Sequence, residues 1–111
     1  DVLDGNGVFQ GGLILPGLDL MRAALADGTA DLPTARGEYR ALPRNTFDAI
    51  ASGAIQATLG AVERMAAPLG KNVECIVAGG AAPLLTPYLA LPHRVVDNLV
   101  LEGVARIAAA L

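Results

Sequence analysis

The stretch that decides the fold is Gly11-Gly12-Leu13-Ile14-Leu15-Pro16-Gly17-Leu18. Its apolar centre predicts a short strand. The glycine pair indicates that another backbone or a ligand comes very close, because a Cβ would be in the way. Pro16 lacks the amide hydrogen that would continue a strand ladder, but it suits the first turn of a helix. We therefore expect a helix over residues 17–27 to leave the end of this strand.

The residues before this stretch predict a β-hairpin. Asp1-Val2-Leu3 and Val8-Phe9-Gln10 flank the turn Asp4-Gly5-Asn6-Gly7, whose glycines supply positive φ. The same turn does not fit a calcium loop, because Val8 stands where an oxygen ligand is needed. A strand, a turn and a second strand are expected here.

A long helix is expected to begin at Asn45 or Thr46, either of which suits an N-cap, and to end near residues 68–70. The negative charge of Asp48 is expected to stabilise the N-terminus of that helix, which is the positive end of the helix dipole. Glycine costs a helix about 1 kcal/mol relative to alanine, so its small residues imply a gain from close packing. They predict that another helix, from this chain or a second subunit, crosses at the row Ala49, Gly53, Ala57 and Gly60.

The loop before this helix carries arginines at every fourth position, Arg36, Arg40 and Arg44. Such a series can meet a phosphate or a carboxylate, or it can be a solvated face. Both interpretations remain open.

The remainder predicts a strand over residues 73–78 that closes at Gly79-Gly80, a short helix over 81–85 and an extended run over 94–96. Asp97 or Asn98 is expected to cap a final helix that reaches residue 111. The order strand, strand, helix, helix, strand, helix, helix predicts a layered α/β unit rather than a helical bundle.

Composition limits the classes of partner. The 111 residues allow one domain, yet 53% are hydrophobic and 17% charged, with a mean hydropathy of +0.48, which suggests that a companion domain or subunit covers part of the surface. A net charge of −3 argues against general nucleic-acid binding. No apolar run approaches the ~20 residues that cross a bilayer, and the single Cys75 fits a reducing compartment. We expect a cytoplasmic protein without nucleic-acid or membrane partners.

No self-sufficient catalytic or metal-binding set is visible. Gly70-Lys71-Asn72 lacks the spacing of a phosphate-binding Walker loop, and Gln10 interrupts a dinucleotide fingerprint. His93 has no second ligand near it in the sequence, and Cys75 is expected to be a small buried residue within a strand. What remains is a set of binding positions.

Several motifs, in order along nearly the whole chain, resemble the C-terminal part of the type III pantothenate kinases, also known as the Bvg accessory factor family. They are the stretch at residues 11–18, Thr29-Ala30-Asp31-Leu32-Pro33, Arg44-Asn45-Thr46-Phe47-Asp48-Ala49-Ile50 with Ser52-Gly53, Gly79-Gly80, and Leu99-Val100-Leu101-Glu102-Gly103.

The resemblance implies that residues 1–111 form the C-terminal α/β domain, of the actin-like, sugar-kinase and ribonuclease H-like kind, of a two-lobed protein whose N-terminal lobe is missing. It implies a cytoplasmic homodimer that transfers the γ-phosphoryl of ATP to pantothenate in the first step of coenzyme A biosynthesis. It also implies a divalent metal such as Mg and a monovalent cation, K or ammonium. In the family, the catalytic aspartate and the cation site precede the position of Asp1. We therefore assign no catalytic or metal residue and expect this chain alone to be inactive.

The resemblance also implies binding residues. Gly79 and Gly80 match a pair that faces the adenosine of ATP, although Ala81 stands where the family often has an acidic residue. Gly11 and Gly12 are further cofactor-binding candidates. Thr46 matches a pantothenate-binding threonine, with a helix cap as the alternative, and Thr29 is a second, weaker substrate candidate.

Asp1 matches a residue that closes a phosphate-facing strand, or else it is an ordinary carboxylate at a strand end. A different class of function stays open: a non-catalytic regulatory or dimerisation module of the accessory-factor type. An Asp-x-Gly-x-Thr loop and a Gly-x-Asp-Arg segment encoded before Asp1 would favour the kinase.

Overall fold

The computed structural model describes residues 1–28 and 37–111, and it divides them between two compact units, Asp1–Pro68 and Leu69–Leu111. Each unit is described by itself. The candidate Thr29, its motif at residues 29–33 and Arg36 lie outside the described residues.

The first unit begins with the predicted hairpin. Strand β1 (Val2–Leu3) pairs antiparallel with β2 (Phe9–Gly11), and a bulge lies between the two registered pairs. The Asp4 carboxylate closes the turn, because its Oδ1 accepts hydrogen bonds of 2.9 Å from the amides of Asn6 and Val8. The turn interpretation is confirmed, since Asp4 satisfies backbone donors of its own loop.

The prediction of a strand at the centre of the 11–18 stretch is wrong. Residues 12–17 belong to neither a strand nor a helix, and β2 ends at Gly11. Among the described residues, no second strand pairs with this run, and the Ile14 side chain is 102% exposed. Neither a ladder nor burial holds the run in a sheet. The helix predicted after Pro16 is confirmed as α1 (Leu18–Gly28), and its first turn closes from the Met21 amide to the Gly17 carbonyl at 2.9 Å.

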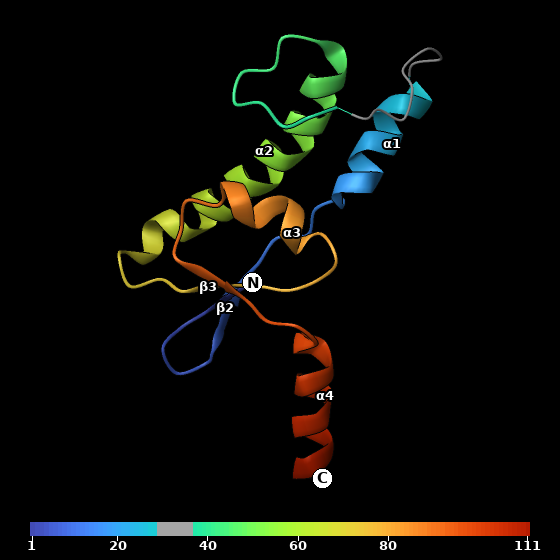
Figure 1. Ribbon diagram of the computed structural model, residues 1–111. Coiled ribbons are helices and arrows are strands. Elements are labelled where there is room, and N and C mark those ends of the chain that lie inside the picture. Colours follow the sequence, from blue (N-terminus) through green and yellow to red (C-terminus); the bar gives the residue numbers. More distant parts are fainter. Residues whose placement is uncertain (29–36) are drawn as a thin grey trace. The chain divides into compact units, whose positions relative to one another are not determined.

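The long helix is confirmed as α2 (Thr46–Ala66), and a 3-10 turn, η1 (Ala67–Leu69), extends it to the predicted end. Helix α1 packs beside α2, as Figure 1 shows. The face of α2 that is removed from solvent consists of small and aliphatic residues together with one serine: Ala51, Ser52, Ala54, Ile55, Leu59 and Ala66.

The small-residue row of α2 meets another helix, but not by close backbone contact. Helix α1 brings Met21 and Leu25 beside Ala49 and Gly53, around a pocket of about 230 Å³. A Cβ added to Gly53 would meet no described atom within 4 Å, and Gly60 is equally open. The crossing helix is therefore confirmed at the first half of the row. No described residue of this chain comes close to the two glycines, and an approach there by a second subunit stays a prediction.

The second unit is a strand–helix–strand unit. Strand β3 (Cys75–Val77) leads through α3 (Ala82–Leu85) and the 3-10 turn η2 (Thr86–Tyr88) to β4 (His93–Val95). The two strands are parallel, with Ile76 opposite Arg94. Parallel strands need a crossover of this kind, and Ala82 and Leu89 are its buried residues. The strand predicted over 73–78 is shorter than expected, and the extended run predicted over 94–96 begins one residue earlier.

The final helix, α4 (Leu99–Ala110), forms as predicted, but its residues are all exposed. Asn98 occupies the cap position with a left-handed backbone (φ 58°), and its side chain makes no capping hydrogen bond, so the predicted side-chain cap is wrong. The two small sheets and their helices confirm a small α/β chain rather than a bundle. Within the described ranges, none of the helices has the length and apolar character needed to cross a membrane.

Candidate functional site

The first turn of α2 leaves the Thr46 hydroxyl free for a ligand. Asn45 is the N-cap, because its Oδ1 accepts the Asp48 amide at 2.9 Å. Thr46 is the first residue of the helix and is exposed, and its hydroxyl makes no hydrogen bond to any described residue. Asn45, and not Thr46, is therefore the residue that caps α2.

Residues 37–45 form a loop that a row of polar side chains on α2 holds against the helix; we call it the pinned loop. The row consists of Asp48, Ser52 and Gln56, which share one face of α2 because they are four residues apart. Ser52 Oγ accepts the Arg40 amide at 2.8 Å and donates to the Glu38 carbonyl at 3.4 Å. The next turn contributes Gln56, whose Nε2 donates to the Ala41 carbonyl at 3.0 Å.

Asp48 is the electrostatic centre of the pinned loop. Its Oδ1 accepts the Glu38 amide and its Oδ2 accepts Asn45 Nδ2, each at 2.9 Å, while Arg40 Nε lies 3.9 Å from Oδ2. The hydrogen bond from the Glu38 amide, followed by those from Asn45 and the charge of Arg40, holds the pKa of Asp48 below its ordinary value of 3.8. Asp48 is therefore an anion at neutral pH.

Gly37 allows the pinned loop to reach the helix. A Cβ at this position would collide with the Phe47 carbonyl oxygen and would lie 2.9 Å from the Asp48 amide nitrogen. Sequence reasoning missed both this glycine and the polar row. The signal that was available is the four-residue spacing of Asp48, Ser52 and Gln56 on a largely apolar helix.

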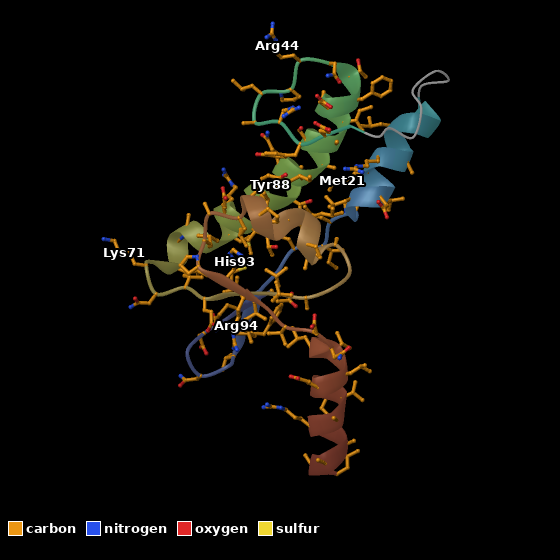
Figure 2. The ribbon with its side chains drawn as sticks, in the orientation of Figure 1. Met21, Arg44, Lys71, Tyr88, His93 and Arg94 are labelled. Carbon is orange, nitrogen blue, oxygen red and sulfur yellow. The ribbon has the colours of Figure 1, made fainter. Side chains whose placement is uncertain are left out.

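The two described arginines of the loop differ in their partners. Arg40 Nη2 forms an ion pair of 2.9 Å with Glu38, so Arg40 belongs to the network of the loop itself. Arg44 has no ion pair or hydrogen bond to its side chain within the described ranges, and Figure 2 shows it extending away from α2. The arginine series is thus divided: one member is structural and one is free.

The glycine candidates of the second unit lie at the carboxyl end of β3. Gly79 has a φ of +106°, a backbone conformation that would be strained in a residue with a side chain. Its carbonyl accepts a hydrogen bond of 3.1 Å from the Ala82 amide. Val96 leaves the neighbouring parallel strand at the same end, where its amide donates to the Val77 carbonyl at 2.9 Å. In open α/β sheets, ligands lie beyond the carboxyl ends of strands.

The glycine candidates of the first unit have a different environment. Gly11 has a φ of +142°, and a Cβ at Gly12 would collide with the Asp1 carboxylate and lie 3.2 Å from Asp1 Cα. The neighbour that requires a glycine at position 12 is therefore the start of the chain itself. Thr46 and the Gly79-Gly80 pair belong to different units.

The remaining candidates have ordinary surroundings. His93 lies in β4 and its Nδ1 donates to the Leu91 carbonyl at 2.8 Å, while Cys75 is a partly buried, free thiol in β3. In the described part of the chain, no three His, Cys, Asp or Glu side chains come together as metal ligands would.

Comparison with known proteins identifies the family. A family profile described as type III pantothenate kinase matches residues 1–68. A type III pantothenate kinase of Aromatoleum aromaticum is 53% identical over 110 residues, which cover 97% of this chain and 46% of that relative. Those of Azoarcus sp. and Dechloromonas aromatica are 52% and 47% identical, over 99% and 97% of this chain and 43% and 46% of theirs. The chain spans less than half the length of these relatives, and it belongs to the type III pantothenate kinase family.

Proposed function

We propose that this chain is the C-terminal domain of a two-lobed, actin-like kinase that uses ATP to phosphorylate pantothenate, the first step of coenzyme A biosynthesis. The observation that carries the proposal is the 53% identity over 97% of the chain to a relative named type III pantothenate kinase. That relative is about twice as long, which leaves room for a second lobe.

Thr46 is the residue we propose for pantothenate binding. A hydroxyl both donates and accepts hydrogen bonds, which suits a substrate that carries hydroxyl, amide and carboxylate groups. Its support in this chain is that Asn45 caps α2 and leaves the Thr46 side chain exposed without a partner among the described residues. Thr29 is proposed as a second substrate residue from the family motif alone.

Gly79 and Gly80 are proposed to lie against the adenosine of ATP. They are supported by their place after a parallel strand and by the positive φ of Gly79, which leaves bare backbone at the carboxyl edge of the sheet. Gly11 and Gly12 are also proposed as ATP-binding residues, with less support, because Asp1 fills the space beside Gly12.

The catalytic carboxylate is proposed to lie outside this chain. Phosphoryl transfer requires a group that accepts the proton of the pantothenate hydroxyl as its oxygen bonds to the γ-phosphorus. A divalent metal such as Mg and a monovalent cation, K or ammonium, belong to the same proposal, and Mg would neutralise phosphate charge. The described residues offer no cluster that fits either ion, so their ligands are also proposed to lie elsewhere.

The protein is further proposed to act as a cytoplasmic homodimer. The alternative function, a non-catalytic regulatory or dimerisation module, is supported by the exposed apolar residues of α4, which an assembly partner would cover. The two functions differ in whether the full-length protein turns over substrate.

The test compares this chain with the full-length protein that contains it, in an assay of ATP-dependent phosphorylation of pantothenate. We expect activity from the full-length protein and none from this chain. A Thr46→Val variant of the full-length protein should raise KM for pantothenate, with Thr58→Val, further along α2, as the matched control. Activity of this chain alone would refute the proposed location of the base. An inactive full-length protein that still dimerises would favour the module.

A further inference from the structure

Helix α4 carries an apolar stripe that is left largely exposed. The stripe consists of aliphatic residues that share one face at helical spacing, and we call it the α4 stripe: Val100, Val104 and Ile107, continued by Leu111 directly after the helix. Val100 is 77% exposed and Ile107 is 67% exposed. The charged residues of the helix, Glu102 and Arg106, are four residues apart on the opposite face. The helix is therefore amphipathic, with its apolar side in contact with solvent.

The helix lacks the features that would stabilise it without a partner. It has 12 residues, and a helix of this length is marginal in water when it stands alone. Gly103, a poor helix former, lies in its interior, and the Asn98 side chain makes no capping hydrogen bond. None of the α4 residues is buried. Burial of the α4 stripe against another surface is the stabilisation that this helix requires.

The charges of α4 argue against a membrane or a nucleic acid as that surface. Helices that lie on membranes carry several lysines or arginines on their polar face, and nucleic acids also require clustered cations. Helix α4 has one cation, Arg106, and the negative charge of Glu102 offsets it one turn away. The surface that fits the α4 stripe is therefore an apolar surface of protein.

The size of α4 argues against the same helix of a second copy as the partner. At 1.5 Å per residue the helix is about 18 Å long, and half the surface of a cylinder about 10 Å wide and of that length is roughly 280 Å². Two copies that faced each other would bury roughly 600 Å², whereas stable interfaces between separate proteins bury at least about 1,200 Å². A surface on the same polypeptide does not need that area, because linkage raises its effective concentration to about the millimolar range.

A longer polypeptide of this family has such a surface available. The chain covers less than half the length of the relatives that it matches, so more than half of each relative lies outside the matched region. Figure 1 shows that α4 follows the strands of its unit and ends at the C-terminus of the chain.

We propose that the α4 stripe packs into an apolar groove formed by the part of the full-length protein that lies outside residues 1–111. Helix α4 then joins this chain to the remainder of the same polypeptide, and its stable folding depends on that contact. The inference rests on the proposed place of this chain within a longer protein, and not on the phosphorylation chemistry.

The experiment follows amide hydrogen exchange of residues 99–110 by mass spectrometry, in this chain and in the full-length protein at two concentrations 100-fold apart. We expect exchange in the full-length protein to be at least about 100-fold slower than in this chain, at both concentrations, because docking adds to the cost of opening the helix.

A pair of variants of the full-length protein tests the face of the helix. Val104→Gln places a polar group in the α4 stripe and should speed the exchange of residues 99–110 by at least about 10-fold, since burial of a valine is lost. Ala109→Gln is the matched control. Ala109 lies two turns after Glu102 on the opposite face, so this change should leave the exchange rate as it is.

Four outcomes overturn the inference. Fast exchange in the full-length protein at both concentrations would show that nothing covers the α4 stripe. Slow exchange that is lost on dilution would identify a second copy as the partner. Equally slow exchange in this chain would mean that residues 1–111 cover the stripe themselves. Equal effects of the two variants would show that the contact does not involve the apolar face.

An assay of pantothenate phosphorylation on the same samples separates this inference from the proposed function. An active full-length protein with an unprotected α4 would remove the docking inference alone. An inactive full-length protein with a protected α4 would remove the proposed kinase function and leave the docking of α4 in place.

Discussion

Helices α2 and α4 share an apolar sequence pattern but differ in how much of it is buried. Both are rich in apolar residues at helical spacing, yet α2 buries six residues and α4 buries none. Within its own unit, α2 packs against α1, and its Ser52 and Gln56 side chains form hydrogen bonds with the backbone of the pinned loop. The comparison teaches that apolar periodicity predicts a helix, whereas burial depends on segments that bring packing and hydrogen bonds to it.

The largest expected difference between the two helices concerns their isoleucines. Ile55 on α2 is 5% exposed and Ile107 on α4 is 67% exposed. Truncating a buried isoleucine to alanine costs about 2 to 5 kcal/mol, because apolar burial is lost and a cavity remains. Ile55→Ala should lower the free energy of unfolding by that amount, and Ile107→Ala should change it by less than about 0.5 kcal/mol. Urea unfolding followed by far-UV circular dichroism measures both, and equal losses would contradict the comparison.

A pair of glycines gives the second test. Gly37 has no room for a Cβ because the Phe47 carbonyl and the Asp48 amide are in the way, whereas a Cβ at Gly103 on α4 would meet no described atom. Gly37→Ala should lower the free energy of unfolding by about 1 to 3 kcal/mol, the usual cost of overpacking. Gly103→Ala should stabilise α4 by about 1 kcal/mol through helix propensity. Amide hydrogen exchange locates the first effect: faster exchange at Arg40 is expected, and an unchanged rate would show that the loop adapts.

The secondary structure was largely predictable from local signals. Pro16 and Gly17 located the start of α1, and Asn45 with Asp48 located the start of α2, because caps and proline act within one turn. The strand expected over residues 13–15 failed for the converse reason. A strand needs a partner, and β-branched or aliphatic content alone does not provide one.

The candidate site was less predictable than the elements that hold it. Thr46 was identified by motif, but its freedom from capping depends on the conformation of Asn45, which the sequence left undecided between the two residues. The arginine series appeared uniform, whereas the structure separates Arg40 from Arg44 through Glu38. Gly37 was not noticed, since a close approach between segments ten residues apart leaves no periodic signal.

The third prediction separates loop anchoring from helix packing. Ser52→Ala removes a buried hydroxyl and leaves the Arg40 amide without its acceptor, which should cost about 1 to 2 kcal/mol. Thr58→Ala on the same helix is the control, because Thr58 Oγ1 donates only to the Ala54 carbonyl of its own helix at 2.9 Å. That change should cost less than about 0.5 kcal/mol. Urea unfolding measures the difference, and similar costs would mean that Ser52 contributes no more than an ordinary helix surface residue.

The smallest effect is expected from pH. The pKa of Asp48 is lower in the folded chain than its ordinary value of 3.8, so its contribution to stability is present above 3.8 and is lost as the pH falls through the folded value. The free energy of unfolding of the wild type, relative to Asp48→Asn, should therefore be constant above pH 5 and decline below pH 3.8.

A second variant identifies the cause of this pH dependence. The hydrogen bond from the Glu38 amide lowers the pKa of Asp48 most, and the charge of Arg40, at 3.9 Å, contributes less. Arg40→Gln should therefore preserve most of the decline below pH 3.8. Loss of the whole decline in that variant would mean that the ion pair, and not the backbone of the pinned loop, holds Asp48 in its charged form. Charge attraction, rather than hydrogen bonding, would then anchor the pinned loop at Asp48. Raising the salt concentration should in that case weaken the contribution of Asp48 to stability.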